Sequence, residues 1–594
     1  MISAFQRSFT TDHVSSIFNT NEKVHVNLVT TATKSGEIAA VAGDKLVPVN
    51  PHALKIVVSE LFSQQYLSVR DLRLFMTGSF MECDKATLAH LMRITGKLTK
   101  DRRDMLLRFY MPVISARVNM LKSKSWNFTH ISCVVFGLQR MKERDNGVLD
   151  ILASMTELAE KTASKREVPN SHHISMMLRG LEKFEGSQQE TKDFLVLIVK
   201  MMKACVTMFD AQHISSCLYG LQSMKSSSKE VRDVLVVLTE RIKESTDMFG
   251  PTNVSSSLYG LQGMSCEHPE VVNLLEALET RIQTCQEAFK PKEVTDSLHG
   301  LQRLTSDHQV VRNILTCITP MIRDCDRPPT AMGVSNAMIG LRCMNVDCTE
   351  VPLLLKAFTQ CITRPVYVPP PHVIVTENAA KKEARVLDGQ GVKNVFNGMR
   401  RMDSENDEVR NLITAVTPLL LASTQKLNAN QLTGSLNGIQ FMSSRRKEVK
   451  KLISILTEKV KQCRQILSPI MVAKCIGSLS KMRYETKEVR ELINALIPIA
   501  ESCKKPLDDV AKSRVKAGLR NMLNERAVVK LLEALKSPEE KTGIVTNGGA
   551  VESEETLVEE KSATHQTETV TETVTVTETV TGTEIEADNE KEMK

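Results

Sequence analysis

The chain has 594 residues, with 77 Lys and Arg against 70 Asp and Glu and a net charge of +7. Only 4% of its residues are aromatic, which argues against an all-β sandwich or a disulfide-rich secreted module. The charge is uneven, because residues 537–594 hold four lysines and fifteen acidic residues, so that residues 1–536 carry +18. Such a basic region favours an acidic partner, nucleic acid first, although a charged solubilising surface explains it equally well.

Residues 1–50 contain no apolar run long enough for a membrane span or a signal peptide, and we expect a flexible segment. The first eleven residues, MISAFQRSFTT, are rich in Ser and Thr, include Arg7 and lack acidic residues, as organellar transit peptides do. Asp12 and Glu22 count against a transit peptide. From the composition of the first eleven residues we expect a mitochondrial or plastid location, and the cytoplasm is the alternative.

Residues 51–120 contain the apolar stretches ALKIVVSELF, LRLFMTGSF and LAHLMRITGKL. Their helical pattern predicts degenerate leading repeats, because the terminal units of a repeat array must turn one face to water.

A unit of about forty residues then recurs, typified by Pro251–Lys290, PTNVSSSLYGLQGMSCEHPEVVNLLEALETRIQTCQEAFK. Apolar residues at helical spacing predict a short helix A and a longer helix B in each unit. A glycine recurs in each helix A, with Ser478 in its place once. This repeat position is occupied by Gly137, Gly180, Gly220, Gly260, Gly300, Gly340, Gly398, Gly438, Ser478 and Gly518. A period of this size predicts an all-α, right-handed α-solenoid of about ten helix pairs.

The array is predicted to occupy residues 121–362 and 388–536. Residues 363–387 form an insertion whose VYVPPPH core cannot be helical and is expected to be a loop that either makes contacts or serves as a linker. Residues 537–594, with the repeat TETVTETVTVTETVTGTE, are predicted to be a disordered acidic tail.

The recurring glycines of the repeat units are expected inside helix A, where each costs about 1 kcal/mol relative to alanine. We therefore expect each of them to mark a close crossing of neighbouring helices.

The sequence predicts no catalysis, no metal, no cofactor and no small-molecule substrate, because phosphate-loop, zinc-helix, nucleophile-elbow and dinucleotide motifs are absent. His130, His173 and His213 share one repeat position, so they are expected one unit apart in first turns and not as ligands of one metal. Cys343 and Cys348 lack the partner pair of a zinc site. Several other cysteines share a small, semi-apolar position late in helix B, which favours a reducing compartment. This position is occupied by Cys205, Ser245, Cys285, Cys325, Ser423, Cys463 and Cys503.

Three positions on helix A, four residues before, one before and three after the glycine, are expected to face away from the core. They vary between units and mix rings, amides and cations, a combination suited to single-stranded RNA, although rings packed between repeats and merely solvated charges remain an open alternative. Arg140, Arg303, Arg401 and Lys481 are expected to hold phosphates, and Tyr219, Tyr259 and His299 to stack on bases. The candidate residues are Arg140, Lys183, Ser216, Tyr219, Ser256, Tyr259, Asp296, His299, Arg303, Asn336, Asn394, Asn397, Arg401, Asn437, Lys474, Lys481 and Arg514.

The units ISSCLYGLQSM, VSSSLYGLQGM and VTDSLHGLQRL, each followed by a longer helix, resemble the repeats of octotricopeptide-type and related organellar RNA-binding proteins. The likeness covers roughly residues 128–536. It implies selective binding to organellar transcripts or ribosomal RNA, in RNA processing, stability, translation or ribosome assembly, without catalysis by the repeats. The alternative is a HEAT- or armadillo-like scaffold that grips a protein or peptide.

Overall fold

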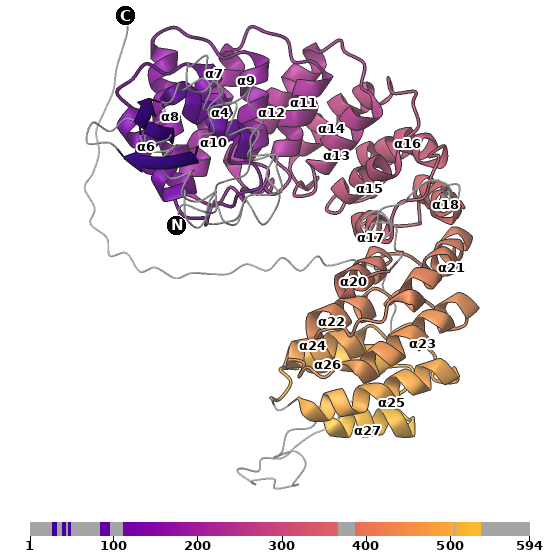
Figure 1. Ribbon diagram of the computed structural model, residues 1–594. Coiled ribbons are helices and arrows are strands. Elements are labelled where there is room, and N and C mark those ends of the chain that lie inside the picture. The colour runs from indigo at the N-terminus through magenta and orange to yellow at the C-terminus, as the bar shows by residue number, and fades with distance from the viewer. Residues whose placement is uncertain are drawn as a thin grey trace, which may run out of the picture. The chain divides into compact units, whose positions relative to one another are not determined.

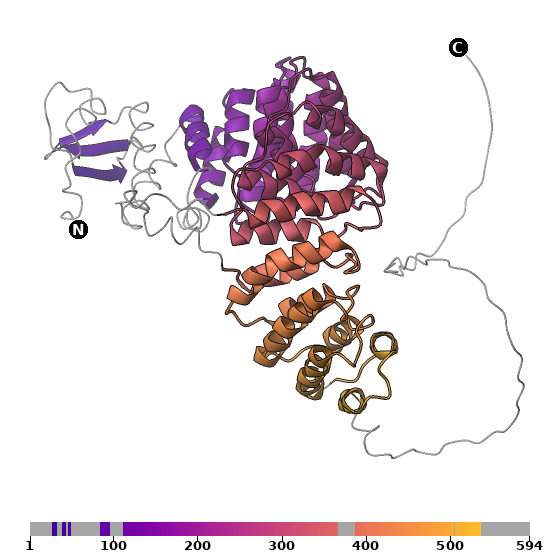
Figure 2. The same cartoon turned by 90° about the vertical axis from the view of Figure 1, so that its right-hand side faces the viewer.

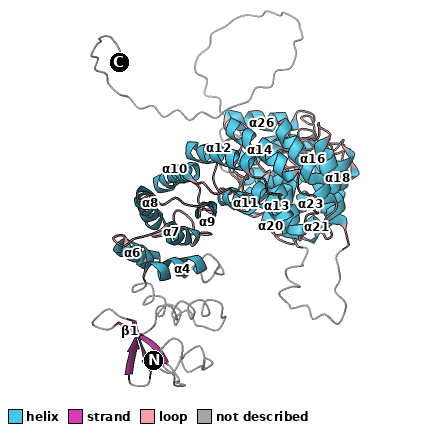
Figure 3. Cartoon of the chain, turned by 90° about the horizontal axis from the view of Figure 1, so that it is seen from above, coloured by secondary structure: helices cyan, strands magenta, loops and turns pink. Residues whose placement is uncertain are grey.

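A computed structural model describes residues 27–32, 38–42, 45–48, 84–95, 111–365, 386–503 and 505–535 (Figure 1). The predicted acidic tail and nearly all of the predicted insertion lie outside these residues. In the described part, helices form one repeating architecture, while the strands belong to a single small sheet near the N-terminus (Figure 3).

The sheet consists of β1 (Asn27–Ala32), β2 (Ile38–Ala42) and β3 (Lys45–Pro48), which pair antiparallel in that order. The sequence led us to expect a flexible segment over residues 1–50, and these strands, which we did not expect, lie within it. A signal was present: Ala42 pairs with Lys45, and the two intervening residues are Gly43 and Asp44, a dipeptide typical of short hairpins.

The repeat array is built from alternating helices of two kinds, and between residues 128 and 502 the second helix of each pair is the longer, as predicted. The helices of the first kind, the A helices, are α4 (Lys85–Thr95), α7 (Phe128–Phe136), α9 (Ser171–Gly180), α11 (Ala211–Gly220), α13 (Pro251–Tyr259), α15 (Pro291–Gly300), α17 (Ala331–Gly340), α20 (Gly389–Gly398), α22 (Ala429–Asn437), α24 (Pro469–Gly477) and α26 (Asp509–Leu519). The B helices are α6 (Met111–Leu121), α8 (Val148–Ser164), α10 (Gln189–Ala204), α12 (Lys229–Glu244), α14 (Pro269–Ile282), α16 (Gln309–Arg323), α18 (Glu350–Thr363), α21 (Asp407–Ala422), α23 (Lys447–Gln462), α25 (Lys487–Ser502) and α27 (Arg526–Ala534).

Each A helix packs against the A helix of the next unit, and each B helix against the next B helix (Figures 1 and 2). This arrangement confirms the α-solenoid. The pair α4 and α6 joins the same stack through contacts with α7 and α8, so a further unit precedes the ten marked by sequence. Apolar side chains from both rows of helices form one continuous core, because neither kind of helix can bury its apolar stripe alone.

The glycines confirm the expected close crossing of A helices. A Cβ atom on Gly260 would lie 2.1 Å from the Leu218 carbonyl oxygen of the preceding A helix, and one on Gly438 would lie 2.1 Å from that of Phe396. Gly398 meets the Met338 carbonyl in the same way, although an eighteen-residue insertion separates their units in sequence. The helix stack therefore continues from α17 and α18 to α20 and α21, and the insertion leaves the crossing geometry unchanged.

A polar residue begins most A helices at one repeat position. Asn170, Asp210, Asp388 and Asp508, for example, each accept a hydrogen bond from the backbone N–H three residues later. Such caps satisfy amides that a helix start leaves unpaired. They fix where each A helix starts and hence which of its side chains face the neighbouring unit.

Candidate functional site

Three predicted site residues come together as a ladder of rings across adjacent A helices. The ring centroids of Tyr219 and Tyr259 lie 5.2 Å apart at an interplanar angle of 21°, and those of Tyr259 and His299 lie 5.4 Å apart at 26°. The Arg179 guanidinium lies 3.5 Å from the centroid of the Tyr219 ring. We call these four residues the ring ladder; each stands immediately before the glycine of its unit. They stack because the glycine crossing brings successive A helices close together.

The ring ladder does not offer the base-stacking surface that the sequence suggested. Tyr259 has a neighbouring ring on each side, so a base could stack on it only if the ladder opened. Burial raises the pKa values of the Tyr219 and Tyr259 hydroxyls and lowers the pKa of His299, whose Nδ1 lies 3.0 Å from the Asn336 carbonyl oxygen. The rings therefore pack between repeats, which was the alternative that the sequence left open.

Three of the four predicted phosphate-binding cations are engaged within the protein. Arg140 lies 4.0 Å from the Glu182 carboxylate. Lys481 pairs with Asp403 at 3.2 Å, and its ammonium lies 5.6 Å from the centroid of the Phe441 ring. Arg401 pairs with Asp307 at 3.3 Å. A phosphate would compete with these carboxylates for cations that remain partly exposed.

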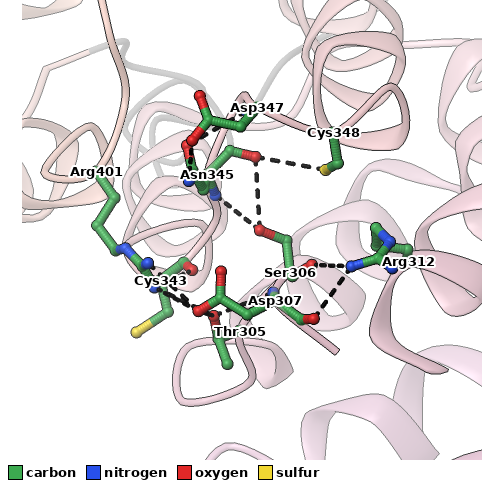
Figure 4. A network of polar contacts seen from close by, with 9 residues as sticks. All are labelled: Thr305, Ser306, Asp307, Arg312, Cys343, Asn345, Asp347, Cys348 and Arg401. Carbon is green, nitrogen blue, oxygen red and sulfur yellow. Dashed lines mark hydrogen bonds and ion pairs between the residues drawn. The ribbon is translucent and has the colours of Figure 1, made fainter. Parts of the chain in front are cut away.

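Arg401 belongs to a network of polar contacts that joins three successive units (Figure 4). Besides Asp307, its guanidinium donates to the Thr305 hydroxyl and to the Cys343 carbonyl oxygen. In the same turn the Ser306 hydroxyl accepts a hydrogen bond of 2.8 Å from the backbone N–H of Asn345. Arg312 donates to the carbonyl oxygens of Ser306 and Asp307. The network links the turns that follow the A helices. Its arginines hold these turns together, although composition alone would suggest that they bind a ligand.

The serine of this network recurs as a repeat position that sequence analysis missed. Ser226, Ser404 and Ser444 each accept from a backbone N–H thirty-nine residues downstream, at 2.8 to 3.0 Å. All three are almost fully buried. The sequence signal was a small residue six positions after the glycine.

The remaining predicted cations on this face, Lys183 and Arg303, line a cavity of about 1170 Å³. We call it the basic pocket. It spans the ends of the A helices and the following turns over the successive units from α7 to α17. Its charged lining residues are Lys142, Lys183, Glu185, Lys192, Lys225, Lys229, Glu230, Arg303 and Arg342. Within the described part of the chain, no ion pair or side-chain hydrogen bond is formed by Lys183, Lys225 or Arg303.

Three amide side chains also line the basic pocket and were not among the predicted site residues. Gln222, Gln262 and Gln302 occupy one repeat position, two residues after the glycine, and we call them the glutamine row. Gln302 Nε2 donates to Gln262 Oε1 at 3.2 Å, and Gln262 Nε2 donates to the Tyr259 carbonyl oxygen at 3.0 Å. The signal in the sequence was the recurring Leu-Gln pair at the end of helix A.

Gln222 differs from the other two amides because its Nε2 has no hydrogen-bond partner, although only 3% of the residue is exposed. The amide is near enough to the Tyr219 hydroxyl to oppose slightly the rise of that pKa, but the pair lacks hydrogen-bond geometry. A buried amide donor without an acceptor is unfavourable and is rare in folded proteins. Because Nε2 itself is covered, a ligand acceptor in the pocket would satisfy it only once the Gln222 side chain turned outward.

The other predicted site residues lie on successive A helices from α11 to α26, one on each except α20, which carries both Asn394 and Asn397. Asp296 pairs with Lys292, and the Asn394 amide donates to Ser335. Lys474 and Arg514 are exposed, and both lie outside the lining of the basic pocket. The half-exposed remainder along the same face consists of Ser216, Ser256, Asn336, Asn397 and Asn437. The basic pocket thus occupies the units from α7 to α17, and these other predicted residues lie outside its lining.

The histidines lie in first turns of successive A helices, as expected. The backbone N–H groups of His130, His173 and His213 each donate to the capping residue three positions earlier. In the described ranges no three His, Cys, Asp or Glu side chains are grouped as they would be to hold a metal ion. The described cysteines are free, and Cys205, Cys285 and Cys325 are buried just past the C-terminal ends of the B helices α10, α14 and α16.

A second cavity, of about 550 Å³, lies between α18 and α21 and has a largely uncharged lining with only Lys356 and Glu408 as ionic groups. None of the helices in the described part of the chain combines the length and the apolar composition needed to cross a membrane.

No family model matches the sequence, and no curated protein matches it. Among solved structures, a homology model of the full-length AP-3 complex in an intermediate open conformation aligns with 82% of this chain and 94% of its own at 11% identity and a TM-score of 0.27. The SYS-1/POP-1 complex aligns at 9% identity and a TM-score of 0.22, over 82% of this chain and 81% of its own. SYS-1 alone aligns at 9% identity and a TM-score of 0.19, over 82% of this chain and 100% of its own. Likenesses this weak decide nothing about function, and the fold assignment rests on the repeated helix contacts described above.

Proposed function

We propose that this chain is a non-enzymatic helical-repeat scaffold that binds a protein partner in the basic pocket. The observation that supports this most is the pocket itself, in which side chains at the same repeat position, the glutamine row, face one cavity over successive units. A solenoid presents such positions at regular steps, and an extended ligand can contact one unit after another.

A protein partner is favoured over RNA by the state of the predicted RNA-binding residues. The faces of Tyr259 are covered by Tyr219 and His299, so single-stranded bases lack a stacking platform there. Arg140, Arg401 and Lys481 already have carboxylate partners.

Single-stranded or ribosomal RNA is the second candidate, because the unpaired Lys183, Lys225 and Arg303 would also attract phosphates. It is linked to the proposal of an organellar location, which rests on the resemblance of the repeats and on the composition of the first residues. A fluorescent fusion of the full chain tests that location separately.

Site-specific photo-crosslinking in cells tests the two candidates. A photoreactive amino acid replaces Ser223, which lines the basic pocket, or, as a control, Val236, which is exposed on α12 and outside it. We expect an adduct from position 223 that protease treatment removes and ribonuclease leaves intact. An adduct shortened by ribonuclease would establish RNA, and equal labelling from both positions would refute a site in the pocket.

A further inference from the structure

We propose that the partner segment bound in the basic pocket is an extended, acidic peptide whose backbone is hydrogen-bonded by the glutamine row. This inference rests on the proposed function and specifies its ligand. It starts from Gln222, whose Nε2 is buried and has no hydrogen-bond partner in a residue that lines the pocket.

An amide side chain is suited to an extended backbone because it carries both a donor and an acceptor. In a peptide without its own secondary structure, the backbone N–H and C=O groups are all available for such pairing, as in peptides that add to an exposed strand. Gln262 and Gln302 already form one link between adjacent units, at 3.2 Å. Gln222 is the next member of the row, and the peptide would supply the acceptor that its neighbours do not.

The spacing of the row also suits an extended chain. Packed helices lie about 8–10 Å apart. Two to three residues of extended peptide cover about 7–10 Å, since each residue rises about 3.3 Å. A peptide lying across the A helices would therefore advance by about two to three residues from one unit to the next.

The charge of the pocket selects acidic side chains. Its lining holds seven Lys and Arg residues and two Glu residues. Lys183 and Arg303 flank the glutamine row at the adjoining repeat position, and neither has an internal carboxylate partner in the described structure. Glutamates alternating along an extended peptide would reach these cations, whereas an apolar or basic peptide would leave them unpaired or repel them.

The test measures binding of three fluorescein-labelled probes to the full chain. They are a dodecapeptide of alternating Glu and Ser, the same peptide with alternate backbone nitrogens methylated, and a dodecamer of uridylate. We expect the unmodified peptide to bind, and methylation to weaken it about tenfold, because the backbone N–H groups that would pair with the glutamine oxygens are lost while the charge and the carbonyl acceptors are kept.

Two variants locate the interaction. Lys183→Glu combined with Arg303→Glu should weaken the acidic peptide at least about tenfold, because two attractions become repulsions. Gln222→Met should weaken it by about threefold to tenfold. The matched controls, Lys474→Glu and Gln440→Met, lie in later units outside the pocket lining and should leave binding unchanged. Thermal unfolding of each variant identifies any loss that reflects misfolding, and the methylated probe tests the wild-type chain without a substitution.

Each contrary outcome has a distinct meaning. Equal affinity for both peptides together with unchanged binding by Gln222→Met would overturn the role of the glutamine row, and tighter binding of uridylate would overturn the peptide in favour of RNA. If no peptide binds but position 223 still crosslinks to a protein, the acidic-peptide inference fails and the scaffold proposal stands. If position 223 crosslinks to no protein, both fail.

Discussion

The units before the insertion, from α9 to α18, and those after it, from α20 to α27, have the same framework but different surfaces. In both halves a glycine meets a carbonyl of the previous A helix, and a buried serine accepts a backbone N–H of the next unit. The surface positions diverge: the ring-ladder position holds Arg179, Tyr219, Tyr259, His299 and Ile339 in the first half but Asn397, Asn437, Gly477 and Ala517 in the second. The glutamine-row position holds Glu182, Gln222, Gln262, Gln302 and Arg342 in the first half but Arg400, Gln440, Ser480 and Arg520 in the second.

This difference shows that the repeat specifies stacking and not binding. Residues that touch the preceding backbone have little freedom, since a larger side chain would separate the helices. Residues at the edge of the stack can change without loss of the fold. A binding site can therefore be confined to a few neighbouring units of a uniform array, and the basic pocket lies in the first half.

The largest loss of stability is expected from substitutions that disrupt the crossing of A helices, which both halves share. Gly260→Ala in the first half and Gly438→Ala in the second should each lower the unfolding free energy by about 3 kcal/mol, because the new methyl group overlaps a backbone carbonyl that cannot move alone. Urea denaturation measures the change. Gly434→Ala is the control, because its methyl would meet only the flexible side chain of Lys393 and should be neutral or slightly stabilising. Unequal losses at 260 and 438 would show that the halves do not share one framework.

The next effect is confined to the first half. Tyr259→Ala removes the central ring of the ladder and should lower the unfolding free energy by about 2 kcal/mol, because two stacked contacts and part of the buried area are lost. Tyr259→Phe should keep most of that stability. Asn437→Ala, at the same position in the second half, should change it little. A stable Tyr259→Ala protein in thermal unfolding would contradict a structural role for the ladder.

A smaller effect should again be equal in both halves. Ser306→Ala and Ser404→Ala each leave a backbone N–H without its acceptor, of Asn345 and Ser443 respectively, at a cost of about 1–2 kcal/mol. Chemical denaturation gives the values, and hydrogen exchange should show faster exchange at those two amides. Ser227→Ala, an exposed residue of a similar turn, serves as control and should have no measurable effect.

The smallest expected effect depends on pH. Burial lowers the pKa of His299 below its ordinary value of about 6.5, so its neutral form stabilises the folded state. That stability is present above the unfolded pKa and is lost as pH falls through the lowered pKa of the folded state. His299→Gln should therefore show a smaller drop in thermal midpoint between neutral and mildly acidic pH than the wild-type chain. An unchanged pH dependence of the thermal midpoint would show that His299 does not contribute to the loss of stability at mildly acidic pH.

The second half provides an internal reference for this pH dependence. Residues 388–536 contain no histidine, whereas His173 and His213 in the first half also have pKa values lowered by burial. Hydrogen exchange, corrected for the intrinsic effect of pH, should therefore report acid-induced loosening in α9 to α17 and little in α22 to α26.

The sequence by itself determined the repeat, its length, the helix pair and the continuity of the array past residues 363–387. It could do so because a periodic glycine and a periodic apolar stripe encode contacts between identical positions of neighbouring units, such as Gly260 against Leu218. It missed β1 to β3, where short strands lack a comparable repeated signal.

Only the tertiary structure decided which surface residues are available to a ligand. In sequence, Arg303 and Arg401 are equivalent members of one position, yet Arg401 is held by Asp307 while Arg303 lines an open cavity. Likewise, Tyr259 reads as an exposed ring until its neighbours are placed on both sides of it. Availability depends on partners from other units, at separations that vary with each side chain, and the periodic pattern of one chain does not encode those encounters.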